Sequence, residues 1–383
     1  MAQTAFVGTY THDAPDGGTP GQQSEGIHVY DTSTRPWRPL NAVASDNPSY
    51  LAIHPRLPML YAVNEVSRFE GESRGSVQAF RILPDAPFLA PVTQCGLALG
   101  ATGPAHLTVS ADGGHLLVSA YGGGQFNTLA LDEAGTPGPV HHIHLLSGRG
   151  PHAERQAAPH AHVVAQSPDL RTWVGCDLGS DRVLFWSLEQ GHLVLEATLA
   201  ARPGSGPRHA VFHPHAPRLY VINELDATID CYARDDATDR PTWRRSQAFT
   251  ALLDTRDTSA HASDRPAAVP SGQPSGAALV MHPSGRWLYA STRRLADNPR
   301  ESDAVSAWEI DPATGALQLI EKYHQGIDFP REMRLSPTGD TLYVLNQKGG
   351  NILAFEIDTA TGALGDPADV AAVPTPVSLV FHG

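Results

Sequence analysis

Short runs of alternating apolar and polar residues recur along the whole chain and are separated by turn residues. A period of two is the signature of a β-strand with one face in the core. The runs come in groups. In each group a proline or small residue opens an alternating run, a turn such as HP or SPDG follows, and two or three further runs complete the group. Residues 48–55, 60–65 and 77–80 form one such group. The pattern therefore predicts repeated antiparallel sheets of about four strands each.

Six complete copies of this group follow one another. They open at Pro48, Pro104, Pro159, Pro207, Pro274 and Pro330. A repeat of about four strands over some 40–50 residues is typical of a β-propeller blade. Residues 4–10 and 26–30 at one end and 376–381 at the other supply the parts of a seventh blade, which would close the ring and remove free sheet edges.

We therefore expect an all-β protein, a seven-bladed β-propeller whose terminal strands share one blade, with residues 1–383 as a single domain. Residues 252–273 lengthen the interval between Pro207 and Pro274 and are expected to form a surface loop insertion. Gly 35 and Pro 32 in 383 residues also favour many short elements over long helices.

Charge and cysteine usage narrow the function. The formal net charge is −13, which argues against a nucleic-acid partner, because such a partner needs a basic face. The three cysteines are far apart and fit a reducing compartment. The first residues lack a basic and apolar leader, and no stretch has the length of a membrane span. We expect a cytoplasmic protein without a membrane partner, a monomer or weak homodimer.

Polar residues occupy equivalent places in the repeats, and equivalent places in a propeller converge on one mouth of the central channel. At the end of the second run stand Asn64-Glu65, Tyr121, Asp177, Asn223-Glu224, Arg293-Arg294 and Asn346-Gln347, and at the openings stand His106, His160, His162, Arg208, His209, Arg331 and Glu332. This convergence predicts a polar pocket.

Arg208 and Glu224 are sixteen residues apart in one repeat, in the first and second runs. An antiparallel pair can bring them to the same end of a hairpin. The arginine would then hold the carboxylate, with both facing a ligand. A purely structural ion pair inside the channel is the alternative.

The segment PHAERQAAPHAH contains His152, Arg155, His160 and His162. A metal site is one interpretation, but the segment has no cysteine and no clear carboxylate ligand spacing. We favour a general acid or base, because histidine transfers protons near neutral pH, over a metal ligand or a structural histidine.

Several arginines could give this acidic protein a local positive pocket. Arg293 and Arg294 end one run, and Arg331 opens the next repeat. Guanidinium groups suit carboxylates and phosphates, because they present forked donors. Exposed solubility charge is the alternative, chiefly for Arg294.

Taken together, these segments resemble a known family. FVGTYT, NPSYLAIHP with LYAVNE, ERQAAPHAH, CDLGSDRV, GPRHAVFHP with VINEL, LYASTR and PREMRLSPTGDTLYVLNQ look like the bacterial lactonase family of seven-bladed propellers, nearly end to end and in order. That family includes propeller-type 6-phosphogluconolactonases and the carboxy-muconate lactonizing enzymes.

The resemblance implies a catalytic set of His162, Arg208, Glu224 and Arg293, without a metal or cofactor. His160 is the second choice for the histidine, and Arg294 is the alternative register for the last arginine. Around this set, the residues expected to bind an anionic lactone are His160, Arg155, His209, Arg294, Arg331 and Asp177.

The expected activity is hydrolysis of a sugar-acid lactone, first of all 6-phosphogluconolactone in the pentose phosphate pathway. An arginine would stabilise the oxyanion, and either His162 or Glu224 would act as the base. The alternatives are a muconate-type cycloisomerase, a lactonase for an unphosphorylated sugar lactone and, in another class, a non-enzymatic binding propeller.

Overall fold

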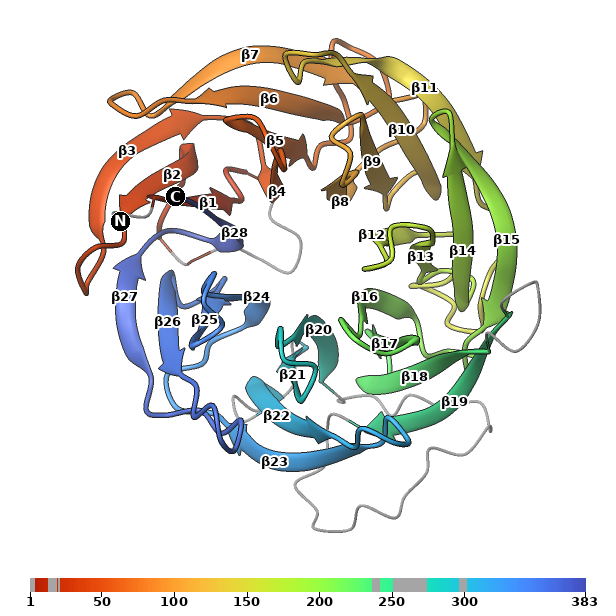
Figure 1. The fold of residues 1–383 in the computed structure, drawn as a ribbon. Coiled ribbons are helices and arrows are strands. Elements are labelled where there is room, and N and C mark those ends of the chain that lie inside the picture. Colours follow the sequence, from red (N-terminus) through yellow and green to blue (C-terminus); the bar gives the residue numbers. More distant parts are fainter. Residues whose placement is uncertain (1–3, 13–18, 20, 236–241, 251–273, 296–301) are drawn as a thin grey trace.

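Seven four-stranded antiparallel sheets surround a central axis in the computed structural model (Figure 1). The structure describes residues 4–12, 19, 21–235, 242–250, 274–295 and 302–383. Each sheet is one blade, and its first strand in the repeat lies nearest the axis. The predicted all-β propeller is confirmed.

The first three complete blades follow the chain in order. Their strands are β4 (Pro48–Ile53), β5 (Met59–Asn64), β6 (Ser76–Ile82) and β7 (Leu89–Gly96); β8 (Pro104–Val109), β9 (His115–Ala120), β10 (Gln125–Leu131) and β11 (Pro137–Leu145); and β12 (Ala161–Gln166), β13 (Trp173–Asp177), β14 (Arg182–Glu189) and β15 (His192–Ala200).

The next three blades repeat the arrangement. Their strands are β16 (Pro207–Phe212), β17 (Arg218–Asn223), β18 (Thr228–Asp235) and β19 (Thr242–Thr250); β20 (Ser275–Met281), β21 (Trp287–Arg293), β22 (Ala304–Ile310) and β23 (Leu317–Tyr323); and β24 (Pro330–Leu335), β25 (Thr341–Asn346), β26 (Asn351–Glu356) and β27 (Ala368–Ala372).

The last blade is shared by the two ends of the chain. Its order is β28 (Pro376–His382), β1 (Thr4–Thr9), β2 (Gly26–Asp31) and β3 (Arg38–Ala44). Strands β1 and β28 pair antiparallel, with Ala5 opposite Phe381 and Val7 opposite Leu379. This pairing closes the ring, as the terminal repeats predict. The insertion expected at 252–273 lies outside the described residues.

The core lies between neighbouring blades, where their faces stack. In one such layer Trp287 and Tyr289 of β21 pack with Val344 and Phe355 of the next blade. Since both faces of a middle strand are covered, β5 and β25 are buried at every position, whereas outer strand β7 is buried only at its first residue. Apolar burial of this kind is the main favourable term in folding.

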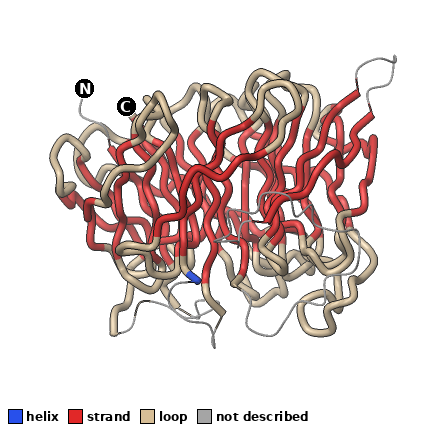
Figure 2. Tube along the Cα trace, turned by 90° about the horizontal axis from the view of Figure 1, so that it is seen from below, coloured by secondary structure: helices blue, strands red, loops and turns tan. Residues whose placement is uncertain are grey.

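The innermost strands all start at the same face of the disc, which Figure 2 shows edge-on. Each is antiparallel to the second strand of its blade, so its start lies beside that strand's end. Polar residues at these two places are thereby gathered at one mouth of the channel. Within the part of the chain that the structure describes, no helix has the length and apolar character to cross a membrane.

Candidate active site

The strand registers define a ring of equivalent positions around one mouth. Pro207 pairs with Asn223, Gly276 with Thr292, and Pro48 with Asn64. The residue after each second-strand partner therefore occupies the same place in its blade. These residues are Tyr10, Glu65, Tyr121, Leu178, Glu224, Arg293 and Gln347. Glu224 and Arg293 are thus equivalent residues of adjacent blades.

Glu224 is the centre of a buried ion cluster. Arg208 Nε donates to its Oε2 at 2.8 Å, and Arg293 Nη2 lies 3.3 Å from the same oxygen. Arg155 Nη2 donates to the other oxygen, Oε1. We call Arg155, Arg208, Glu224 and Arg293 the arginine layer. Arg208, Glu224 and Arg293 are buried, whereas the Arg155 side chain is 36% exposed at the mouth.

The cluster carries an excess of positive charge, because three guanidinium groups face one carboxylate. Burial alone would raise the pKa of Glu224, but the charges of Arg155, Arg293 and Arg208 outweigh it and hold that pKa well below its usual range. Burial and the neighbouring Arg293 lower the pKa of Arg208 to about 10, so it stays charged at neutral pH. The site is therefore suited to an anion or a developing oxyanion.

Arg155 comes from the loop before β12, and hydrogen bonds hold that loop to the third blade. Gln156 Nε2 donates to the Leu178 carbonyl and to Asp181 Oδ1, each at 2.8 Å. The Asp177 carboxylate accepts from the backbone N–H of His160 at 2.8 Å. Asp177 thus fixes the loop and does not reach the arginine layer through any of its hydrogen bonds to described residues.

His160 and His162 both pack against the ring of Tyr121. The His160 ring stacks on Tyr121 with centroids 4.4 Å apart, and its Nδ1 is 3.0 Å from the Tyr121 carbonyl. His162 is buried, and its Nδ1 has no hydrogen-bond partner among the described residues. Burial, followed by the charges of Arg208 and Arg331, holds the pKa of His162 well below its usual value. His162 is therefore neutral and can accept a proton.

Arg331 approaches the mouth from the second position of another inner strand, β24. Its Nη2 donates to the Tyr10 hydroxyl at 2.5 Å, and that hydroxyl donates to Glu65 Oε2 at 2.8 Å. Tyr10 and Glu65 belong to the ring of equivalent positions. They orient Arg331, which is only partly buried, so a second partly exposed arginine stands at the mouth besides Arg155.

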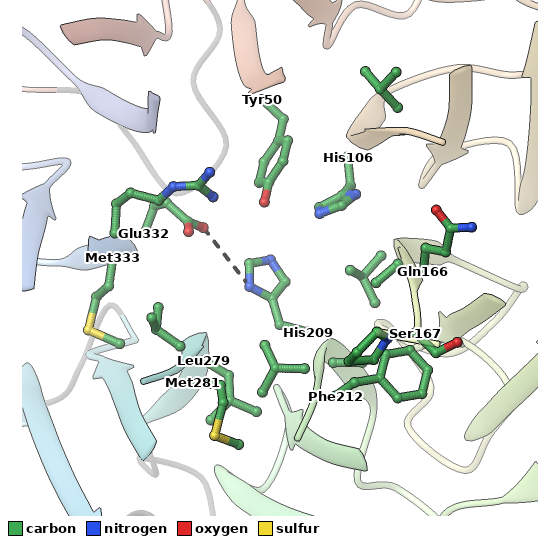
Figure 3. A pocket seen from close by; sticks show the side chains of 18 of the residues that line it. Tyr50, His106, Gln166, Ser167, His209, Phe212, Leu279, Met281, Glu332 and Met333 are labelled. Atoms are coloured by element: carbon green, nitrogen blue, oxygen red, sulfur yellow. Dashed lines mark ion pairs between the residues drawn. The ribbon is translucent and has the colours of Figure 1, made fainter. Parts of the chain in front are cut away.

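A second polar layer lies on the inner strands, at His209, which follows Arg208, and at the equivalent positions of other blades (Figure 3). It contains Tyr50, His106, His209 and Glu332, and we call it the histidine layer. The ring centroids of Tyr50 and His106 are 4.0 Å apart, and His209 Nδ1 lies 4.0 Å from Glu332 Oε2. The His209 ring centroid is 5.3 Å from that of His162, which links the two layers.

Burial shifts the pKa values of two groups in the histidine layer, and in both cases it favours the neutral form. Burial, with the charges of Arg208 and Arg334, lowers the pKa of His106 to about 3. Burial raises the pKa of Glu332 to about 7, because it outweighs the opposing charges of Arg208, Arg334 and Arg331.

A cavity of about 550 Å³ begins at the histidine layer and continues between the apolar ends of the inner strands, past Phe212 and Met281. That is the volume of a small-molecule site.

Not every residue expected from the sequence joins the site. Arg294 is held by two carboxylates: its Nη2 lies 2.8 Å from Asp328 Oδ1, and its Nη1 pairs with Asp303. Its charge is thereby matched outside the arginine layer, which contains Arg293 instead.

Two residues of the site, Tyr10 and Tyr50, received no role from the sequence, because tyrosines fit ordinary strand positions. His106 and Glu332 were noted at repeat openings but were not assigned to the site. The signal that could have found all four is positional equivalence: each aligns with charged residues of other repeats. Among the described residues, no group of three or more His, Cys, Asp or Glu side chains is arranged to hold a metal ion.

Comparisons with known proteins agree with this architecture. The model of a family described as "Lactonase, 7-bladed beta-propeller" matches residues 4–381. A 6-phosphogluconolactonase of Bacillus subtilis is 27% identical over 98% of this chain and 97% of its own length. A 6-phosphogluconolactonase of Formosa agariphila is 29% identical over 94% of both chains. The periplasmic gluconolactonase of Pseudomonas aeruginosa superposes with a TM-score of 0.82 at 28% identity, covering 100% of this chain and 99% of that one.

Proposed function

The chain belongs to the lactonase family of seven-bladed β-propellers, and from that premise we propose that it hydrolyses a sugar-acid lactone, first of all 6-phosphogluconolactone. The observation that carries the proposal is the arginine layer, in which Arg155, Arg208 and Arg293 surround one buried carboxylate beside the neutral His162. This arrangement supplies positive charge where an acyl oxygen becomes an anion. Relatives named 6-phosphogluconolactonase support the choice of substrate.

In the proposed reaction, water attacks the lactone carbonyl, and the ring C–O bond breaks once the tetrahedral oxyanion collapses. His162 takes the proton of the attacking water and returns it to the ring oxygen that leaves. Glu224 is unsuited to this step, because three arginines hold its pKa well below its usual range. Its role is to fix the arginines in place.

An anionic substrate would also assist the base. The pKa of His162 is held low by burial and then by positive neighbours, including Arg208 and Arg331. A phosphate or carboxylate bound at the mouth would offset those charges and make protonation of His162 easier. Arg155 and Arg331 are the partly exposed arginines placed to hold such a group.

We propose further that the protein works in the cytoplasm on a small anionic lactone, as a monomer or weak homodimer, with neither nucleic acid nor membrane as a partner. The net charge of −13 and the three free cysteines support this setting.

The test is hydrolysis of freshly generated 6-phosphogluconolactone, followed by acidification and corrected for spontaneous opening. Gluconolactone and a muconolactone are assayed beside it. We expect fast opening of the phosphorylated lactone. Activity on gluconolactone alone would move the substrate to unphosphorylated sugar lactones, and turnover of the muconolactone alone would favour a cycloisomerase. Silence on all three would overturn the enzyme proposal.

A further inference from the structure

The histidine layer contains polar groups that the proposed reaction does not use. Tyr50, His106, His209 and Glu332 stand at equivalent positions of four inner strands, where the other three blades have Val163, Ala278 and Ser378. Their side chains point toward one another around the channel axis (Figure 3). Four polar side chains that converge at the end of a cavity are unusual in a core position, because burial of polar groups costs free energy.

The described residues leave several polar atoms of this layer without a hydrogen-bond partner. His106 is 6% exposed, and its Nδ1 has no partner among the described residues. The Tyr50 hydroxyl makes no hydrogen bond to any residue that the structure describes. Glu332 is 8% exposed, and the 4.0 Å between its Oε2 and His209 Nδ1 is too long for a hydrogen bond. Buried groups of this kind call for a partner that is not part of the fold.

The chemistry of the layer favours hydroxyl groups over a second anion. His106 and His209 are neutral, because burial and nearby arginines lower their pKa values, and each presents one donor and one acceptor. Tyr50 adds a hydroxyl. A carboxylate or phosphate at this depth would meet Glu332, whereas each uncharged hydroxyl of a ligand can donate to one of these groups and accept from another.

The layer also lies at the right depth. The His162 and His209 ring centroids are 5.3 Å apart in an edge-to-face contact, so the histidine layer lies directly beside the proposed base. A ring whose carbonyl contacts the arginine layer would therefore extend its substituents to the histidine layer and the cavity beyond it. This placement rests on the proposed lactonase function.

We propose that the histidine layer determines specificity: Tyr50, His106, His209 and Glu332 bind the ring hydroxyls of the substrate and select hydroxylated lactones over bare ones. The layer is separate from the groups that perform the chemistry. A site built to hydrogen-bond a hydroxyl rejects an analogue without it, because its own buried polar groups then stay unpaired.

The experiment compares kcat/KM for glucono-δ-lactone and δ-valerolactone, which share the six-membered lactone but differ in hydroxyl groups. The wild type is expected to prefer gluconolactone at least tenfold. Tyr50→Phe and Glu332→Gln are each expected to lower that preference about five- to tenfold, as the loss of one hydrogen bond would. Tyr30→Phe is the matched control. Tyr30 lies in the blade shared by the termini, and its hydroxyl donates to the Ala372 carbonyl of the neighbouring blade. This substitution should leave the preference unchanged.

An unchanged preference in both Tyr50→Phe and Glu332→Gln, with gluconolactone still opened, would overturn this proposal and leave the lactonase function standing. If the wild type opens no lactone, the proposed function fails, and calorimetry then tests whether the histidine layer binds hydroxyl groups. Gluconate and hexanoate are the probes. Weaker binding of gluconate to Tyr50→Phe than to the wild type, with hexanoate unchanged, would support a hydroxyl-binding layer; equal binding or none would refute it.

Discussion

The arginine layer and the histidine layer meet on inner strand β16, where His209 follows Arg208, yet they treat buried polarity in opposite ways. In the arginine layer, Glu224 is paired with Arg155, Arg208 and Arg293. In the histidine layer, His106 Nδ1 has no partner among the described residues, and Glu332 stands 4.0 Å from His209.

The two carboxyl groups show what this difference means. Both Glu224 and Glu332 are buried, and burial raises the pKa of each. Three arginines reverse the effect at Glu224, whereas at Glu332 the opposing charges are too weak and the pKa rises to about 7. Paired charge gives a fixed electrostatic site; unpaired polarity gives a site that a ligand must complete.

The largest expected effect is at Arg208. Arg208→Ala should lower kcat/KM for the preferred lactone by about 10²- to 10³-fold, as loss of an oxyanion donor does. Circular dichroism should show the fold retained, because Arg155 and Arg293 still pair with Glu224. Turnover close to that of the wild type would remove Arg208 from the reaction.

Glu224→Gln tests the paired side of the comparison. It should lower the free energy of unfolding by about 3 kcal/mol at pH 7, since three buried arginines lose their counter-charge. Because the folded pKa of Glu224 lies below its ordinary value of 4.5, this stabilisation is present above pH 4.5 and is lost as the pH falls. Urea unfolding of both proteins from pH 7 to pH 3 measures it, and parallel curves would contradict the pairing.

Glu332→Gln should give the opposite pH dependence. The folded pKa is raised from 4.5 to about 7, so between these values the unfolded chain ionises first and the wild type loses stability as the pH rises. The variant lacks this carboxyl. Its stability relative to the wild type should therefore increase by about 1–3 kcal/mol from pH 4.5 to pH 8. A constant difference across this range would show that Glu332 ionises normally.

The smallest effect on activity is expected at Arg294, the neighbour of Arg293 in the chain. Arg294→Gln should change kcat/KM less than about twofold, because Asp303 and Asp328 already hold this side chain outside the arginine layer. It should cost about 1–3 kcal/mol of stability, since buried Asp303 loses its charged partner and keeps only backbone N–H donors among the described residues. A large loss of activity would return Arg294 to the substrate site.

Much of the site could be predicted from the sequence, because a repeat converts position into geometry. Arg208 and Glu224 stand on paired strands of one blade, and the pairing of Pro207 with Asn223 places them side by side. Arg155 could be suspected only from its neighbours. It reaches Glu224 from a loop of a different blade, and the hydrogen bonds of Gln156 that hold that loop have no sequence signature.

The sequence by itself determined the blades, their number and the closure of the ring, because strand alternation and turn residues are local properties that recur in every repeat. Only the tertiary structure decided which polar residues are neutralised and which are left to a ligand. Arg293 and Arg294 are adjacent in sequence, yet one contacts Glu224 and the other Asp303 and Asp328. Glu224 and Glu332 are the same residue type with opposite pKa shifts. Such differences depend on burial and on charges from other blades, and both exist only after the ring has closed.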